Sequence, residues 1–380
     1  FVCCFKIKTM SKINVRSPYY IYITEANLDS AKLELYVYTG TQGTRGAIDY
    51  TINSTAVGNK ITFEISELVR DYIENTFDGS YTSSAVWVDY QITRTVSGSA
   101  QTPEAFVQLT GFDGYGYFSE GANPQNTQTV LQSNKTIYKY SDAPLRLPAH
   151  VTTSTDFTFL QDGSSIYNTT LTASTNSDNT IRYVSSESAA GVDSWQDRVV
   201  LDGGTIESLY CVKDFLEDID LYGVDTIYVD NGTTVEVYNV ENIEECLDTP
   251  YKLTFVNKFG ALQDLWFFKR STLSMNTSQQ TYKSNLVVDG SYSINKHQKS
   301  ILTKQGNESL TLNSGFYSED NNEVFKQLFL SEQVWIEYDS ETLPINITSS
   351  NLVHKTRLKD KLISYEISLE FSNDTINNIR

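Results

Sequence analysis

Apolar and polar residues alternate strictly in several segments of this chain. The clearest segment is ISYEISLEF, whose apolar face comprises Ile363, Tyr365, Ile367, Leu369 and Phe371. The same period recurs in KLELYVY (32–38) and in ITFEI (61–65). Because successive side chains of a strand point to opposite faces of a sheet, this period predicts antiparallel strands with one buried and one solvated face.

Turn residues separate some of the alternating segments. The sequence DNG at 230–232 lies between TIYV and TTVEVY, and its Asn-Gly pair can adopt the positive φ angles of a tight hairpin. We therefore predict a β-hairpin at this position. The same reasoning predicts chain reversals at the DG of 162–163 and at the DGG of 202–204.

Few segments have the period of a helix. Ser66 is a candidate N-cap for ELVRDYIEN, which has its apolar residues on one face and an acid in its first turn. Asn321 or Asn322 is a candidate cap for EVFKQLFLSE. The apolar stripe of that second segment comprises Val324, Phe325, Leu328 and Phe329. A third short helix is predicted within SLYCVKDFLEDI (208–219).

The segment LTFVNKFGALQDLWFFKRS (253–271) is unusually aromatic, ending in Trp266, Phe267 and Phe268 before a Lys-Arg pair. Gly260 permits a reversal between two apolar runs, so the segment predicts a hairpin. Alternation places one of the three rings opposite the other two, which suits a strand covered on both sides. We interpret the rings as core or subunit interface, because alternation explains them without a ligand. If the Trp266 ring is buried, Trp266→Ala should cost roughly 3–5 kcal/mol.

Domain boundaries are predicted from the segments that resist regular structure. Pro144 and Pro148 in SDAPLRLP disfavour both a helix and a central strand, and LDTP (247–250) precedes the aromatic segment. The expected domains cover 11–145, 150–248 and 249–380. The range 150–248 could instead belong to one of the neighbouring domains.

The composition supports a β fold. The chain has 380 residues with 25 Tyr and 18 Phe, and its aromatic fraction of 12% favours strands. We expect a mainly β protein of two or three antiparallel, β-sandwich-like domains with two or three short helices.

The charge excludes some partners. With 29 basic against 47 acidic residues, the chain lacks the dense basic surface that phosphate backbones require, so no direct nucleic-acid binding is expected. No apolar run approaches the roughly 20 residues of a membrane helix, so we expect no membrane contact. Residues 1–10 are interpreted as an upstream translated extension, because Met10-Ser11-Lys12 resembles an ordinary translation start. The apolar run of residues 1–5 is too short for the core of a signal peptide.

Cysteine usage indicates a reducing compartment. Beyond Cys3 and Cys4 of the presumed extension, the chain has Cys211 and Cys246. Two thiols are too few for a disulfide framework, so we expect buried free thiols, with a single bridge as the alternative.

No sequence motif names a reaction. The three histidines, His150, His297 and His354, lie in no nucleophile-elbow or HExxH context, and no nucleotide-binding glycine motif is present. The acidic clusters DFLEDID (214–220) and SEDNNE (318–323) lack the spacing of a calcium loop and are interpreted as solvated faces. We expect no catalytic residue, no cofactor and no metal. The 47 acids leave a glycosidase-type pair of carboxylates open as an alternative.

The order of segments carries a resemblance. LTFVNKFGALQDLWFFKRS is followed by a Tyr- and Ser-rich stretch, NEVFKQLFLSE, VWIEY, LPINITSS and LISYEISLEFSNDTINNI, and the N-terminal part contains RSPYYIYI, FEISELVRDYIEN and GFDGYGYFSEG. This order resembles virion structural proteins of tailed bacteriophages. The resemblance implies a non-enzymatic tail, baseplate or neck component, assembled in the host cytoplasm and located in the virion.

Copies of the chain itself and other virion proteins are the implied partners, in a homo-oligomeric ring or collar. Many Tyr residues suit such contacts, because Tyr buries a large area at a low entropic cost. One alternative is a carbohydrate-binding or host-surface attachment module, in which exposed Trp and Tyr stack on glycan. A second is a polysaccharide-degrading enzyme. The candidate packing or interface residues are Trp266, Phe267, Phe268, Trp87 and Trp335.

Overall fold

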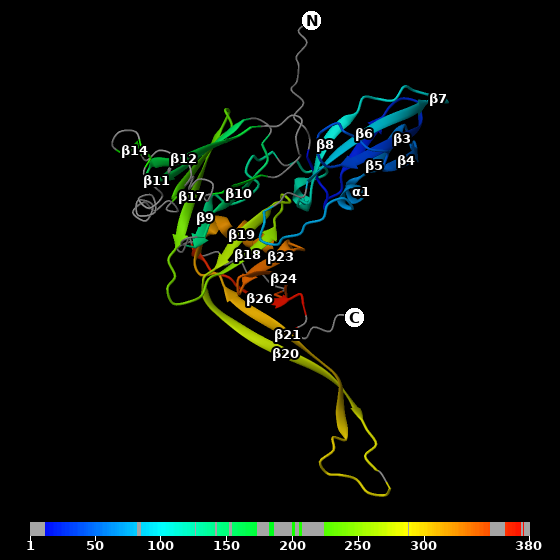
Figure 1. Ribbon diagram of the computed structural model, residues 1–380. Helices are drawn as coiled ribbons and strands as arrows, with labels where there is room; N and C mark the ends of the chain where they lie inside the picture. The colour runs from blue at the N-terminus through cyan, green and yellow to red at the C-terminus, as the bar shows by residue number, and fades with distance from the viewer. Residues whose placement is uncertain are drawn as a thin grey trace. The chain divides into compact units, whose positions relative to one another are not determined.

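The protein is mainly β in its computed structural model, with several antiparallel sheets (Figure 1). This confirms the fold class predicted from the sequence. Within the described part of the chain there are two α-helices, α1 (Ser66–Arg70) and α5 (Asn322–Leu330), and two 3-10 turns, η1 (Phe118–Glu120) and η2 (Glu319–Asn321). The structure describes residues 12–81, 85–125, 127–140, 143–151, 154–172, 182–185, 200–201, 205–206, 224–287, 289–349, 362–373 and 375.

Packing groups the chain into two compact units. Unit 1 comprises residues 1–244, 254–265 and 320–332, and unit 2 comprises residues 245–253, 266–319 and 333–380. This division differs from the three consecutive ranges expected from the sequence. Leu145 and Phe157, which those ranges place in different domains, belong to one buried cluster.

Unit 1 begins with a six-stranded sheet. Its strands follow the order β1-β8-β6-β3-β4, with β7 paired to β6, and every pair except the parallel β1–β8 pair is antiparallel. A separate antiparallel pair is formed by β2 (Tyr20–Thr24) and β5 (Lys60–Glu64). The strands of the sheet are β1 (Lys12–Asn14), β3 (Leu28–Tyr38), β4 (Tyr50–Thr55), β6 (Ala85–Val96), β7 (Ser99–Ala100) and β8 (Val107–Phe112).

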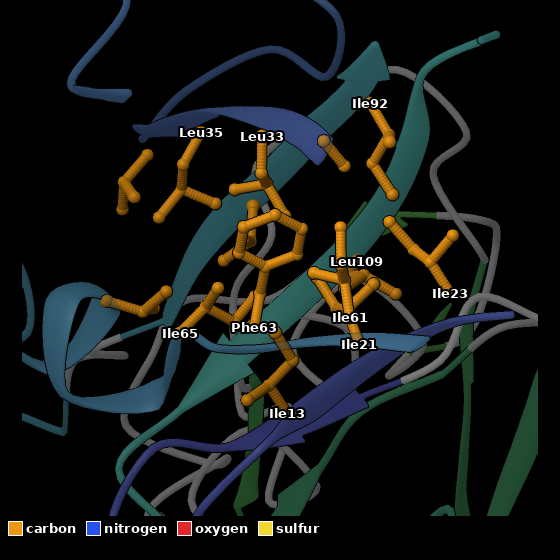
Figure 2. Close-up of a cluster of buried hydrophobic side chains, with 14 of the residues drawn as sticks. Ile13, Ile21, Ile23, Leu33, Leu35, Ile61, Phe63, Ile65, Ile92 and Leu109 are labelled. Atoms are coloured by element: carbon orange, nitrogen blue, oxygen red, sulfur yellow. The ribbon is translucent and has the colours of Figure 1, made fainter. Parts of the chain in front are cut away.

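The core of this region is formed by the inward faces of both sets of strands. Figure 2 shows Ile61 and Phe63 of β5 gathered with Leu33 and Leu35 of β3 in one apolar cluster. All four side chains are buried. The alternation in KLELYVY and ITFEI is thus confirmed.

The first helix differs from its sequence-based prediction. α1 is only five residues long, its N-cap is Ile65, and Ser66 is the first helical residue. The reason is that Glu64 accepts hydrogen bonds from both the backbone N–H and the hydroxyl of Ser66, so the Ser66 side chain caps nothing.

A five-stranded sheet forms the second part of unit 1. Its order is β12-β11-β16-β17-β9, and its inward face contributes Phe157, Phe159, Ile227 and Val229 to a buried cluster. The strands are β9 (Thr136–Tyr140), β11 (Thr155–Gln161), β12 (Ser164–Leu171), β16 (Thr226–Asp230) and β17 (Val235–Ile243). Two small antiparallel pairs accompany it: β10 (Arg146–Ala149) with β13 (Arg182–Ser185), and β14 (Val200–Leu201) with β15 (Thr205–Ile206).

Both described glycine turns of this region form hairpins as predicted. Asp162 and Gly163, at φ 50 and 74, join β11 to β12 as a two-residue loop. The loop between β16 and β17 is longer, and only Gly232 adopts a positive φ, because the Asn231 side chain accepts the N–H groups of Thr233 and Thr234. The predicted reversal at 202–204 and the helix predicted at 208–219 lie outside the described residues.

A seven-stranded sheet has the order β19-β18-β23-β24-β26-β21-β20, and most of its strands belong to unit 2, whereas residues 254–256 of β18 and 262–265 of β19 belong to unit 1. β22 (Tyr317–Ser318) and β25 (Leu362–Ile363) form a further antiparallel pair. The strands of the sheet are β18 (Tyr251–Val256), β19 (Leu262–Phe267), β20 (Lys269–Lys283), β21 (Lys299–Asn313), β23 (Val334–Tyr338), β24 (Glu341–Ile347) and β26 (Glu366–Phe371).

The aromatic segment forms the predicted hairpin of β18 and β19. Its loop is closed by the backbone bond from Asn257 to Ala261, at 2.8 Å, and Gly260 has φ +78. The ISYEISLEF segment alternates in burial as predicted, but it is divided. Ser364 and Tyr365 separate β25 from β26, because the Tyr365 backbone N–H donates to the Ser314 hydroxyl instead of continuing a ladder.

Helix α5 lies where the sequence predicts it, with Asn321 at the N-cap, but the Asn321 side chain makes no capping bond. Its amide instead pairs with Asn134, at 3.0 Å. The buried stripe includes Gln327 in place of the expected Phe329, because the Gln327 amide donates to Ser133 and accepts the N–H of Lys258.

Lys12 in β1 is a buried ammonium, and burial lowers its pKa to about 8. Its Nζ donates to the Gln128 carbonyl at 3.3 Å and has no ion pair among the described residues. Since the unfolded chain has the higher pKa, it binds more protons between about pH 8 and 10.5, so the free energy of unfolding rises with pH in that window. Lys12→Met should therefore stabilise the protein by about 2 kcal/mol at pH 7, with the gain vanishing above about pH 10.5.

Urea unfolding of both proteins at pH 7 and pH 10.5 measures this difference. The exposed Lys60 provides the control, because Lys60→Met removes a charge that burial does not oppose. A destabilised Lys12→Met protein at pH 7 would contradict the expectation.

Candidate interaction surface

The long hairpin of β20 and β21 leaves the sheet of unit 2 as an arm. β21 pairs with β26 only through Ser309–Asn313, and β20 is an edge strand paired only with β21. Residues 275–308, named the arm below, therefore have no strand beside them except each other (Figure 1). At about 3.3 Å per residue, the nine residues from Met275 to Lys283 span roughly 30 Å.

The arm exposes almost every side chain. Met275 is 54% exposed and Ile301 53%, and Val287, Tyr292 and Ile294 of the connecting segment are exposed as well. A two-stranded ribbon in water has no core and is marginally stable by itself. A free edge of this length also presents unpaired backbone groups that favour pairing with another chain. The arm thus has the features of a surface that is completed by a partner.

The two faces of the arm differ in chemistry. Residues directly opposed in an antiparallel ladder share a face. One face is uncharged and polar between the root and the bulge of the ribbon, with the opposed pairs Asn276–Asn307, Ser278–Gln305 and Gln280–Thr303. The other face, named the basic face below, carries three lysines and one acid, Lys283, Lys299, Lys304 and Glu308, together with Met275 and Ile301.

The charge of the arm is opposite to that of the rest of the chain. The arm contains four Lys against two acids, whereas the remaining residues contain 25 basic and 45 acidic side chains. Lys283 and Lys299 are opposed directly in the ladder, a like-charge pair that destabilises a hairpin. Neither lysine has an ion pair within the described residues. An acidic partner would relieve this repulsion.

The root of the arm is fixed by an ion pair and an aromatic contact. Lys269 donates to Glu245, and this hydrogen bond lowers the pKa of Glu245 to about 2. The Phe268 ring packs against Tyr317 with ring centroids 5.7 Å apart. It also lies where a side chain at Gly315, which has φ +76, would clash with it.

A second candidate site is a cavity of about 440 Å³ in unit 1. Its charged residues are paired with each other, Lys258 with Glu120 and Lys326 with Glu323. Both ammonium groups also approach the Tyr117 ring, at 4.5 and 3.5 Å from its centre. The remaining lining residues named in the structure are Asn14, Tyr115, Pro124, Gln125, Thr127, Gln128, Ser133 and Phe259.

The chemistry of this cavity does not favour acid catalysis. Burial and the hydrogen bond to Glu323 raise the pKa of Tyr117, so its hydroxyl stays protonated. Burial also acts to raise the pKa of Glu120, but the hydrogen bonds from Lys258 and from the Tyr117 backbone outweigh it, and the pKa is lowered. A general acid needs the opposite shift. We assign no reaction to this cavity.

Several predicted sites have structural roles. Asp320 of the SEDNNE cluster accepts the backbone N–H groups of Lys135 and Thr136, and Glu323 accepts from Tyr117. The His150 ring packs edge-on against Phe112, 5.0 Å between ring centres. Among the described residues no three His, Cys, Asp or Glu side chains are grouped as metal ligands would be. The DFLEDID cluster, Cys211 and His354 lie outside the described residues.

The candidate aromatic residues occupy different environments. Phe267 and Trp335 are buried, whereas Trp266 and Phe268 are half-buried on either side of Phe267. Trp87 is also buried, and its indole N–H donates to the Gly40 carbonyl at 2.8 Å. Trp87 therefore offers no open ring face for a sugar.

The expectation of a buried thiol can be examined only at Cys246, which is exposed and not in a disulfide. This part of the expectation is wrong, because Cys246 lies in a surface connection between β17 and β18. No helix among the described residues combines the length and apolar character that crossing a membrane requires.

No protein-family model matches the chain, and a search of curated proteins returns no matching sequence.

Sequence reasoning missed the arm because its strands lack the apolar alternation that marks a half-buried sheet. The sequence of β20 is rich in Ser, Thr, Asn and Gln on the uncharged face. A signal was nevertheless present, since four Lys and two acids fall within residues 275–308 of an otherwise acidic chain.

Proposed function

We propose that this protein is a non-enzymatic structural subunit of a multi-copy particle, of the tail, baseplate or neck type built by tailed bacteriophages. The observation that carries the proposal is the arm. An exposed ribbon roughly 30 Å long with no sheet beside it is costly for a monomer and useful for a subunit that reaches a neighbour. The order of sequence segments supports the phage origin by resemblance.

Other features agree with a scaffold function. The edge strands offer backbone donors and acceptors for pairing between chains. The two α-helices of the described chain are short, and the polar cavity has its charges compensated internally. The proposed location is the virion, after assembly in the host cytoplasm. The proposed partners are further copies and other virion proteins.

Deleting the arm should abolish self-assembly. Ser274 and Ser309 are directly opposed, so an Asn-Gly turn between them can replace residues 275–308 without changing the register. The intact chain is expected to sediment as a higher oligomer at high protein concentration, and the deleted chain as a monomer. Analytical ultracentrifugation measures both, and circular dichroism verifies that the β fold remains.

An intact chain that stays strictly monomeric, and is absent from purified phage particles by mass spectrometry, would overturn the proposed function. If the chain without the arm assembles as the intact chain does, the arm is not required for assembly. The control deletes only the exposed tip, replacing residues 286–295 by Gly-Ser linkers, and should retain assembly.

A further inference from the structure

The outer face of the five-stranded sheet in unit 1 is the complement of the basic face of the arm. Side chains alternate along its strands, and the outward ones include Tyr228, Val235 and Val237, which are exposed apolar residues. A sheet face with exposed apolar side chains is a candidate contact surface. This surface, with the acids described next, is named the acidic face below.

The charges of the acidic face are all negative. Asp156, Asp230 and Glu241 are exposed on it, and its described outward residues include no Lys or Arg. Asp156 and Asp230 are directly opposed across β11 and β16. Their hydrogen bonds come from Thr170, at 2.5 Å, and from the Gly232 backbone, at 2.8 Å, both neutral donors.

The molecule therefore carries two like-charge ladder pairs of opposite sign. Lys283 faces Lys299 on the arm, and Asp156 faces Asp230 on the sheet. Each pair repels within its own ladder. Placing one pair over the other would bring two ammonium groups to two carboxylates and remove both repulsions. Met275 and Ile301 would then meet the exposed apolar residues of β16 and β17.

We propose that the basic face of the arm of one copy docks on the acidic face of a second copy. This inference rests on the proposed function as a self-assembling subunit, and it adds the partner and both surfaces. The second copy is the occupant because the arm is basic, the rest of the chain is acidic, and the two opposed pairs are equal in number and opposite in sign. Each copy has one arm and one acidic face, so the contact repeats from copy to copy and can close a ring.

A single contact of this kind is small. A two-stranded ribbon roughly 30 Å long covers less than the about 800 Å² per partner of a standard interface. Each copy of a closed ring makes the contact twice, which strengthens the assembly beyond one pair. The contact should also weaken as salt is added, because it depends on partly exposed charges.

Reciprocal charge reversal tests the proposal. Variant A carries Lys283→Glu and Lys299→Glu, and variant B carries Asp156→Lys and Asp230→Lys. Variant A alone opposes acids to acids, and variant B alone opposes lysines to lysines, so each should associate at least tenfold more weakly than the intact chain. An equal mixture should recover the association, because every arm then meets a face of opposite charge.

The control is Ser278→Glu with Gln280→Glu, which adds negative charge to the uncharged face of the arm and should leave association unchanged. Sedimentation velocity of A, B, their mixture and the control gives the result. The proposal is overturned if A and B each assemble like the intact chain, or if their mixture stays dissociated while the intact chain assembles. In the second case the proposed function survives, since assembly then uses another surface. An intact chain that stays monomeric would contradict both the proposed function and the proposed contact between the arm and the acidic face.

Discussion

Replacing Asn257 by leucine should lower the free energy of unfolding by about 3–5 kcal/mol, one of the two largest effects expected of a single side chain here. Asn257 is fully buried in the loop between β18 and β19, and its amide donates to the Leu131 carbonyl at 2.7 Å and to Gln263 at 3.0 Å. Its carbonyl oxygen accepts the N–H groups of Phe259, at 2.9 Å, and Ala261, at 3.1 Å.

Leucine has a similar size, so the substitution isolates the hydrogen bonds from the packing. It leaves two backbone N–H groups and one carbonyl buried without these partners, and each unsatisfied buried group costs about 1–3 kcal/mol. Urea unfolding monitored by tryptophan fluorescence measures the loss. Asn53→Leu, at an exposed position of β4, is the control and should change stability by less than about 0.5 kcal/mol. A loss below about 1 kcal/mol at Asn257 would mean that the loop rearranges to satisfy its own backbone.

Phe267→Ala is expected to have a comparable effect, a loss of about 3–5 kcal/mol. The ring is fully buried at the end of β19, and alanine would remove its apolar contacts and leave a cavity. The expectation formed from the sequence assigned this loss to Trp266 if its ring was buried. Because the Trp266 ring is half-buried, Trp266→Ala should cost less than Phe267→Ala.

The comparison of these two variants is informative because the residues are adjacent in one strand. Differential scanning calorimetry of both proteins gives the order of their losses. Phe267→Leu is the conservative control and should recover most of the stability, since it refills much of the cavity. Equal losses for Phe267→Ala and Trp266→Ala would contradict the assignment of Phe267 to the interior.

The sequence predicts the strands whose apolar residues alternate against a core. Leu33, Leu35 and Phe63 are buried as that pattern requires, and the glycine turn at 162–163 joins its strands as expected. The pattern succeeds because burial of one face fixes both the period and the register of a strand. It fails at Ser364 and Tyr365, where a hydrogen bond to a distant serine ends the ladder without changing the period.

Helix ends were predicted less well, because both expected cap side chains bond to other partners. Ser66 and Asn321 are both good capping residues, yet each bonds to another partner, Glu64 in one case and Asn134 in the other. Gln327 is buried by hydrogen bonds to residues far along the chain. A tertiary partner overrides the local preference at Asn321 and Gln327, whereas a residue two positions earlier does so at Ser66.

The arm was not predicted from the sequence. The interpretation of the rings at 266–268 as core or subunit interface stays a prediction for the part that concerns contacts between copies. The arm itself depends on the length over which β20 and β21 pair, which periodicity cannot give when both faces are polar or mixed. The opposed pair Lys283–Lys299 becomes visible only once the register is known.

The distribution of the chain between its two units has a consequence for synthesis on the ribosome. Unit 1 contains residues 320–332, including α5, and so cannot be completed until those residues emerge. The arm at 275–308 is translated before them. A nascent chain therefore exposes the arm before its own unit 1 is complete. Contacts between chains that form only after translation has ended avoid pairing the arm with an incomplete unit 1.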